Sequence, residues 1–121
     1  MVKLIFDTNI LIDYLNGVEQ ARTELALHTD KAISLITWME VMDGATSSTE
    51  AVIKGFLDKF TSLPLTEDVA ILATKLRNHH QITLPTAIVL ATAQINSRIL
   101  VTRNTNDFAD LEPGIRTPYQ L

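Results

Sequence analysis

The sequence predicts an α/β domain in which a mostly parallel sheet of four to five strands lies between two layers of helices. Three observations predict this fold class. Short apolar segments alternate with amphipathic segments along the chain, the length is 121 residues, and 46% of the residues are hydrophobic. Strands that alternate with helices normally pair in parallel and are covered on both faces, and this length suits one core. We therefore expect a single three-layer α/β/α domain over residues 1–121.

The expected strands are short apolar runs. The first covers residues 2–6 and is ended by Asp7, which fits a buried parallel strand. The other strands are expected at residues 32–36, 62–65 and 99–102, with a weaker fifth at 115–117.

The expected helices carry apolar residues three and four positions apart, as residues 53–60 do. Thr37 and Thr66 are good N-cap residues, and Pro85 suits a first helical turn. These signals predict helices at residues 9–16, 19–28, 38 to about 44, 49–60, 67 to about 76, and 85–97.

Composition excludes several classes of function. The chain has no cysteine, so a thiolate zinc site, a cysteine nucleophile and a disulfide framework are excluded. Its formal net charge of −4 disfavours nucleic-acid binding through a generally basic surface. An acidic chain can still act on phosphates where metal ions bridge them to its carboxylates. The apolar run at the start is too short for a signal peptide or a membrane span, so we expect a cytoplasmic protein without membrane contact.

Two carboxylates follow strands directly or closely. Asp7 comes immediately after the first strand, and Asp107 lies in the loop after the fourth. In parallel sheets the active site normally lies beyond the carboxyl ends of the strands. Glu40, on the helix after the second strand, stands in an apolar stretch, where we expect it to be shielded and to need a partner.

Four segments occur in a recognisable order: residues 6–11, Thr37 with Glu40, residues 84–93 and residues 101–108. Each is weak alone, but together they resemble the motifs of PIN domains, and the length is similar to that of VapC toxins of toxin–antitoxin pairs. The resemblance implies a three-layer α/β/α fold and Mg²⁺- or Mn²⁺-dependent endonucleolytic cleavage of RNA phosphodiesters. It also implies a homodimer and a VapB-like antitoxin whose C-terminal segment lies across the active site.

The resemblance also implies roles for individual residues. Magnesium and manganese prefer hard oxygen ligands, so carboxylates suit them, and hydrolysis through bound water needs no covalent intermediate. Threonine and asparagine side chains would orient the carboxylates or bind water and phosphate. The expected set is Asp7, Glu40 and Asp107 as catalytic metal ligands, Thr8 and Asn9 orienting Asp7, Thr86, Thr102 and Asn104 in support, and Arg103 as a phosphate contact.

Thr86 departs from the pattern, because PIN domains normally carry an aspartate there. A threonine hydroxyl is a poor Mg²⁺ ligand compared with a carboxylate. The residues leave three readings open. The chain is a weakened but active nuclease, a degenerate PIN scaffold that binds RNA or antitoxin without cutting, or a toxin disarmed by an introduced change.

Other polar residues receive simpler interpretations. Asp13 and Asp43 are expected to be surface charges. The neighbouring His79 and His80 point apart on a helix and are not expected to chelate one ion. An unrelated doubly wound phosphohydrolase or receiver-like domain is the remaining alternative, although the late strand is followed by Thr102-Arg103-Asn104 without the lysine such domains need.

Overall fold

A computed structural model gives the structure of residues 2–104 and 114–121. Within these residues, helices and strands alternate as the sequence predicts. The elements are β1 (Leu4–Phe6), α1 (Thr8–Leu15), α2 (Glu19–Ala26), β2 (Lys31–Ser34), α3 (Leu35–Asp43), α4 (Glu50–Leu57), β3 (Thr61–Leu63), α5 (Glu67–His80), α6 (Leu84–Ile95), β4 (Ile99–Val101) and β5 (Ile115–Arg116).

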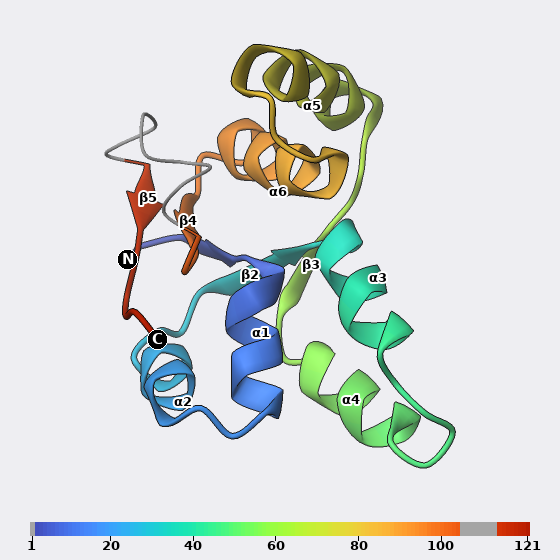
Figure 1. Cartoon of the computed structure of the whole chain (residues 1–121), viewed down its shortest axis with the longest axis vertical. Helices are drawn as coiled ribbons and strands as arrows, with labels where there is room; N and C mark the ends of the chain where they lie inside the picture. Colours follow the sequence, from blue (N-terminus) through green and yellow to red (C-terminus); the bar gives the residue numbers. More distant parts are fainter. Residues whose placement is uncertain (1, 105–113) are drawn as a thin grey trace.

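The strands of the described residues form one sheet in the order β3-β2-β1-β4-β5, and every neighbouring pair is parallel. The central strand is β1, where Ile5 stands opposite Ala32 of β2 and Leu100 of β4. Figure 1 shows the sheet between two groups of helices. The expected parallel α/β sheet of four to five strands is therefore confirmed.

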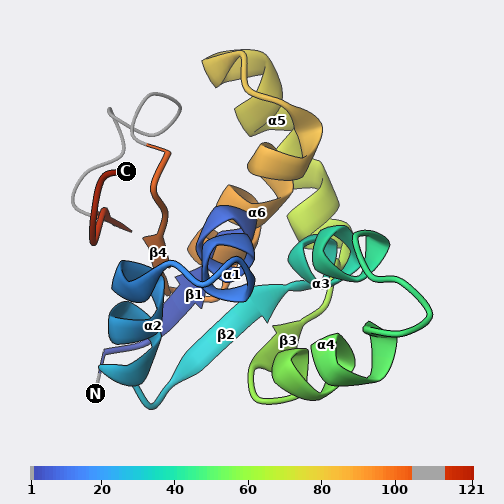
Figure 2. The same ribbon diagram turned by 60° about the horizontal axis from the view of Figure 1, so that its bottom comes forward.

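Two apolar cores lie on the two faces of the sheet. Successive residues of β1 alternate between them, because neighbouring side chains of a strand point to opposite faces. Ile5 contributes to the core under α5 and α6, which we call the α5–α6 core. Leu4 and Phe6 contribute to the core under α1, α2, α3 and α4, which we call the α1–α4 core. Figure 1 shows α5 and α6 on one side of the sheet and α1, α2 and α4 on the other, and Figure 2 shows α3 and α4 near β3.

Helix starts differ from the expectation at α3. This helix begins at Leu35, and its N-cap is Ser34, whose Oγ accepts a hydrogen bond of 3.2 Å from the Ile36 amide. The expected N-cap, Thr37, lies inside the helix and is buried. The prediction was wrong because Ser34 also belongs to the apolar run of β2, which hides its capping role. At α5 the expected N-cap is confirmed, since Thr66 accepts a hydrogen bond from the Val69 amide.

The last strand is fastened to α2 by a buried carboxylate. Glu24 is only 3% exposed and accepts hydrogen bonds from Arg116 Nε at 2.6 Å and Nη2 at 2.8 Å. His28 Nε2 lies 3.0 Å from the same carboxylate. The hydrogen bonds from Arg116, aided by its charge and by His28, outweigh burial and hold the pKa of Glu24 below its ordinary value. The pair joins residues 92 positions apart in the sequence.

None of the helices formed by residues 2–104 and 114–121 is long and apolar enough to cross a membrane.

Candidate active site

The carboxyl ends of β1 and β4 meet at one edge of the sheet, where the Asp7 amide donates to the Val101 carbonyl at 2.9 Å. A cavity of about 600 Å³ opens there. Its walls come from β1 and α1, from α3, from the start of α6 and from the segment after β4. The lining residues are Asp7, Thr8, Asn9, Ile12, Glu40, Thr83, Pro85, Thr86, Arg103 and Asn104. Four separate segments of the expected site thus come together at this edge.

Asp7 is both the N-cap of α1 and a wall of the cavity. Its Oδ1 accepts a hydrogen bond from the Thr8 amide at 2.8 Å, and its Oδ2 accepts from Asn9 Nδ2 at 3.3 Å and Thr102 Oγ1 at 2.8 Å. Thr102 is fully buried, so its hydroxyl acts on Asp7 from behind the cavity. Three donors, two from α1 and one from the residue that follows β4, therefore fix the direction of this carboxylate, as partners of metal-binding carboxylates usually do.

Glu40 reaches the same cavity from α3. Thr8 Oγ1 donates to Glu40 Oε1 at 2.7 Å, and the Thr8 and Thr37 hydroxyl oxygens lie 3.0 Å apart. Thr8 thus contacts both expected metal ligands, Asp7 through its amide and Glu40 through its hydroxyl. The expected shielding of Glu40 is wrong, because the residue is exposed while its neighbour Val41 is buried. A helix buries one side only, and Glu40 lies on the cavity side.

Thr86 lines the cavity near the start of α6. Its hydroxyl accepts a hydrogen bond of 3.0 Å from Thr83 Oγ1. Thr83 is the N-cap of α6 but its side chain makes no capping bond. Sequence reasoning did not assign Thr83 to the site, although it lines the cavity and directly precedes the Leu84-Pro85 helix start.

Arg103 is held by two residues of α1. Its amide donates to Asn9 Oδ1 at 3.2 Å, and its guanidinium donates to Asp13 through Nε at 2.7 Å and Nη2 at 3.0 Å. Tyr119 Oη also donates to Asp13 Oδ2, at 2.8 Å. Arg103 lines the cavity, as expected, but its guanidinium is engaged by a carboxylate of the protein itself.

The expectation that Asp13 is a surface charge is therefore wrong, whereas Asp43 is exposed as expected. Asp13 is 5% exposed. Burial opposes ionisation of Asp13, but hydrogen bonds from Arg103 and Tyr119 and the charge of Arg103 outweigh it and hold the pKa below its ordinary value. Burial and the hydrogen bond to the Asp13 carboxylate raise the pKa of Tyr119 well above its ordinary value. The sequence could not show this because both partners lie far along the chain, 90 and 106 positions away.

The cavity offers oxygen donors of the kind that Mg²⁺ and Mn²⁺ prefer. The carboxylates of Asp7 and Glu40 line the cavity, and so do Thr86, with its hydroxyl, and Asn104, with its side-chain amide. Asp107, the third expected ligand, lies outside the described residues. Within the described residues no three histidine, aspartate or glutamate side chains form a metal-binding group. This donor set fits an ion that keeps several of its water ligands, as Mg²⁺ usually does.

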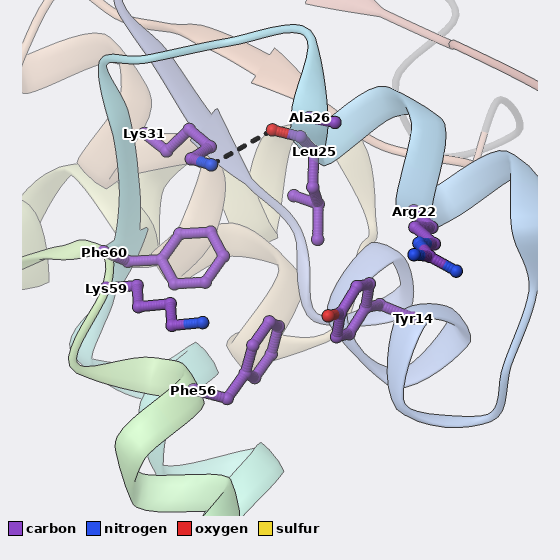
Figure 3. A pocket seen from close by; sticks show the side chains of 8 residues that line it. All are labelled: Tyr14, Arg22, Leu25, Ala26, Lys31, Phe56, Lys59 and Phe60. Atoms are coloured by element: carbon purple, nitrogen blue, oxygen red, sulfur yellow. Dashed lines mark hydrogen bonds between the residues drawn. The ribbon is translucent and has the colours of Figure 1, made fainter.

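A second cavity, of about 230 Å³, lies between α1, α2 and α4 (Figure 3). Its floor is aromatic: the rings of Tyr14 and Phe56 stack at 4.7 Å, and Phe56 meets Phe60 edge to face at 5.3 Å. Lys31 Nζ lies 5.8 Å from the Phe60 ring centroid and donates to the Leu25 carbonyl. Three cationic side chains surround this apolar cup, and they are Arg22, Lys31 and Lys59.

The family comparison agrees with the fold. The PIN domain family matches residues 4–112. The chain therefore belongs to the PIN-domain family, and the receiver-like alternative is excluded. A toxin–antitoxin complex from Klebsiella pneumoniae contains a similar chain, 44% identical over 98% of this chain and 100% of that one, with a TM-score of 0.93. The resemblance to VapC-type PIN toxins is thereby confirmed.

Two further structures are similar. DNA-bound VapBC from Salmonella typhimurium is 28% identical over 96% of both chains, with a TM-score of 0.78. FitAcB from Neisseria gonorrhoeae is 23% identical over 98% of this chain and 99% of that one, with a TM-score of 0.80, and shows the fold alone. Comparison with curated protein sequences gives no match. Together, the family and the neighbours place the chain among VapC-like PIN domains.

Proposed function

We propose that this protein is a metal-dependent endoribonuclease, the VapC-like toxin of a toxin–antitoxin pair, which hydrolyses RNA phosphodiesters. The observation that supports the proposal most is the cavity at the carboxyl ends of β1 and β4. It brings together Asp7, Glu40 and Thr86, which stand in three of the four PIN-like segments. The choice of RNA rests on the resemblance to VapC toxins.

In the proposed site, Asp7, Glu40 and Asp107 hold Mg²⁺ or Mn²⁺. When bound, the ion would polarise the phosphate of the substrate and lower the pKa of a water molecule that it binds. Thr8 and Asn9 keep the Asp7 carboxylate directed at the cavity, through the hydrogen bonds described above. No nucleophilic side chain is required.

The remaining residues of the proposed site act on water, phosphate or the shape of the cavity. Thr86 and Asn104 offer neutral oxygens that accept hydrogen bonds from metal-bound water, and the Thr86 hydroxyl and the Asn104 side-chain N–H groups can donate to phosphate. Thr102, which is buried, acts through Asp7. Arg103 contributes positive charge near the phosphate while its guanidinium stays paired with Asp13. The Asp107 contribution is carried over from the fourth PIN-like segment.

Thr86 supports a second candidate function, a degenerate PIN scaffold that binds RNA or antitoxin without cutting. The Thr86 hydroxyl stands where PIN domains normally carry an aspartate carboxylate, and it already accepts a hydrogen bond from Thr83. Loss of one negative charge weakens a site for a divalent cation. The two candidates differ in whether the two described carboxylates and Asp107 suffice for turnover.

We further propose that a VapB-like antitoxin uses the second cavity and that the toxin forms a homodimer. The aromatic floor of the cavity suits an apolar side chain, and the ring of Arg22, Lys31 and Lys59 suits flanking carboxylates. This cavity shares helix α1 with the active-site cavity, so one extended segment along α1 would block access to Asp7. A small antitoxin encoded by the neighbouring reading frame is the partner to test.

The experiment compares the purified chain with Asp7→Asn and Glu40→Gln. Mn²⁺ binding is followed by calorimetry, and cleavage of total RNA is followed with Mn²⁺ and with EDTA. The proposal expects Mn²⁺-dependent cleavage that both substitutions abolish and EDTA removes. Cleavage that survives Asp7→Asn would sink it, and Mn²⁺ binding without any cleavage would favour the degenerate scaffold.

The same assay tests the partner, since the neighbouring gene product should inhibit cleavage and Lys59→Glu should weaken that inhibition. Sedimentation of the free chain tests the dimer.

A further inference from the structure

Helix α1 holds the segment after β4 at two points. Asn9 and Asp13 are four residues apart and so lie on one side of the helix, one turn from each other. Asn9 Oδ1 accepts from the backbone amide of Arg103, and the Asp13 carboxylate accepts two hydrogen bonds from its guanidinium. The backbone and the side chain of Arg103 are thus both fixed to the same helix.

The two residues that flank Arg103 belong to the active-site cavity or to its back wall. On one side Thr102 donates to Asp7 Oδ2 at 2.8 Å, and on the other Asn104 lines the cavity. The Asn104 amide donates back to Thr102 Oγ1 at 3.0 Å. An unbroken chain of contacts therefore leads from Asp13 through Arg103 and Thr102 to the Asp7 carboxylate.

Asp13 is suited to serve as the fixed end of this chain of contacts. It is 5% exposed, and it accepts hydrogen bonds from Arg103 and from Tyr119, which follows β5. A buried carboxylate with a bidentate arginine and a further donor is held in one geometry, because each lost bond leaves a buried charge poorly satisfied. Asp13 thereby joins three parts of the chain, α1, the segment after β4 and the C-terminal segment.

We propose that Asp13 is a positioning residue of the nuclease site, which holds Arg103 against α1 and so keeps Thr102 on Asp7 and Asn104 at the cavity. Tyr119 completes the carboxylate's partners from the C-terminal segment. The effect on turnover rests on the proposed function, whereas the effect on the segment after β4 does not. Asp13 itself is absent from the cavity wall, and it acts only through Arg103.

A competing role for Arg103 makes the opposite prediction. If Arg103 leaves Asp13 to bind a substrate phosphate, removing the Asp13 charge frees the guanidinium, and KM for RNA falls while kcat is kept. If Asp13 positions the segment, the same change loosens Thr102 and Asn104, and kcat falls with little change in KM. The KM-against-kcat split therefore separates a positioning residue from a restraint on a phosphate-binding arginine.

The chain offers a matched control. Glu24 is a buried carboxylate with the same bidentate bonding to an arginine, Arg116, and it also ties the C-terminal segment to a helix. Its side-chain partners are Arg116 and His28, and Arg116 meets Thr102 through its backbone carbonyl, which accepts the sheet hydrogen bond of the Thr102 amide at 3.0 Å. Glu24→Gln and Asp13→Asn therefore remove the same kind of interaction. Only the second releases the side chain of Arg103, whereas the first leaves the backbone bond between Arg116 and Thr102 in place. Tyr119→Phe, which leaves both Arg103 bonds in place, is the milder second variant.

The test measures backbone amide hydrogen exchange by NMR and Mn²⁺ affinity in the full chain, together with kcat and KM for RNA. In Asp13→Asn we expect the amides of Arg103 and Asn104 to lose protection while those of β1 keep it. We also expect Mn²⁺ affinity or kcat to fall, by at most the roughly 10- to 100-fold that losing a direct partner of a ligand costs. Tyr119→Phe should shift the same readouts less, and Glu24→Gln should leave them unchanged.

Equal effects of Asp13→Asn and Glu24→Gln on exchange at residues 103 and 104 would overturn the proposal, as would a fall in KM at unchanged kcat. Should Asp13→Asn fail to fold, the exchange pattern of Tyr119→Phe decides in the same way. Should the wild-type chain neither bind Mn²⁺ nor cleave RNA, the proposed function fails. The exchange measurement would still support or refute the positioning of the segment by Asp13.

Discussion

Thr86 lies in the first turn of α6 and forms part of the cavity wall. Its hydroxyl accepts a hydrogen bond from Thr83 and brings no charge to the cavity. For a hard divalent cation, affinity depends strongly on how many ligands are charged. At the scale of single residues, the activity of this protein therefore depends on whether Asp7, Glu40 and Asp107 compensate for the neutral group at position 86.

We predict that Thr86→Asp raises both metal affinity and RNA cleavage. The new carboxylate faces the same cavity and lies in the first turn of α6, where the helix dipole favours negative charge. Mn²⁺ affinity should rise about tenfold or more, since charge count tunes such sites over wide ranges. Calorimetry and cleavage at matched Mn²⁺ concentration measure the effect.

Thr86→Asn is the control for this prediction, because it adds an amide of aspartate's shape without the charge. It should behave like the wild-type chain. If the wild-type chain already cleaves as fast as Thr86→Asp, the neutral residue is not what limits activity.

At the scale of elements, the short strand β5 is held by side chains as well as by its backbone hydrogen bonds to the sheet. It consists of Ile115 and Arg116, which pair with only two residues of β4. The bidentate pair of Arg116 with Glu24 fastens it to α2. Since the C-terminal segment also carries Tyr119, which bonds Asp13 of α1, two helices on one face of the sheet hold the end of the chain in place.

We predict that Glu24→Gln lowers the free energy of unfolding at pH 7 by roughly 1.5–3 kcal/mol, the range for hydrogen bonds to charged groups. The pKa of Glu24 is lowered by folding. Its stabilising effect is therefore fully present above the unfolded pKa of about 4.3 and is lost as the pH falls through the lower folded value. Urea unfolding of both proteins between pH 7 and pH 3 measures this.

The difference in free energy of unfolding between the wild-type chain and Glu24→Gln should shrink as the pH falls below about 4, because wild-type Glu24 then becomes protonated. A difference that is the same at pH 7 and pH 3 would show that the charge of Glu24 contributes nothing. Asp43→Asn, at an exposed carboxylate of α3, is the matched control and should leave the free energy unchanged.

At the scale of the whole molecule, one thin sheet supports two cores. Leu4 and Phe6 of β1 pack in the α1–α4 core, and Ile5 between them packs in the α5–α6 core. Because β1 contributes side chains to both cores, loss of packing in one core also destabilises the strand on which the other core depends. The active-site cavity draws on both sides, since α1 and α3 carry Asp7, Thr8 and Glu40, and α6 carries Thr86.

We predict that the two cores unfold together. Leu90 is 2% exposed in the α5–α6 core, and Leu90→Ala should cost about 2–5 kcal/mol. Trp38, the single tryptophan, packs against the α1–α4 core. Its fluorescence and the far-ultraviolet circular dichroism should shift to the same lower urea midpoint in Leu90→Ala. A Trp38 transition that keeps the wild-type midpoint would show that the two faces unfold separately.

The order of elements was predictable from the sequence because it depends on local patterns. Alternating apolar runs and amphipathic stretches specify strands and helices, and a strand followed by an aspartate specifies a polar strand end. These patterns sufficed for the parallel sheet, for the family resemblance and for the meeting of the Asp7, Glu40 and Thr86 segments. Helix boundaries were less certain where a residue served two elements, as Ser34 does.

The sequence by itself determined the fold class, the family and which short segments would form the candidate site. Only the tertiary structure decided that Asp13 is buried with Arg103 and Tyr119, that Glu24 is buried with Arg116, and that Glu40 faces outward beside Thr8. The physical reason is that a charged residue on a helix looks the same in sequence whether it meets solvent or a partner. The partners of Asp13 and Glu24 come into reach only when the end of the chain packs against α1 and α2.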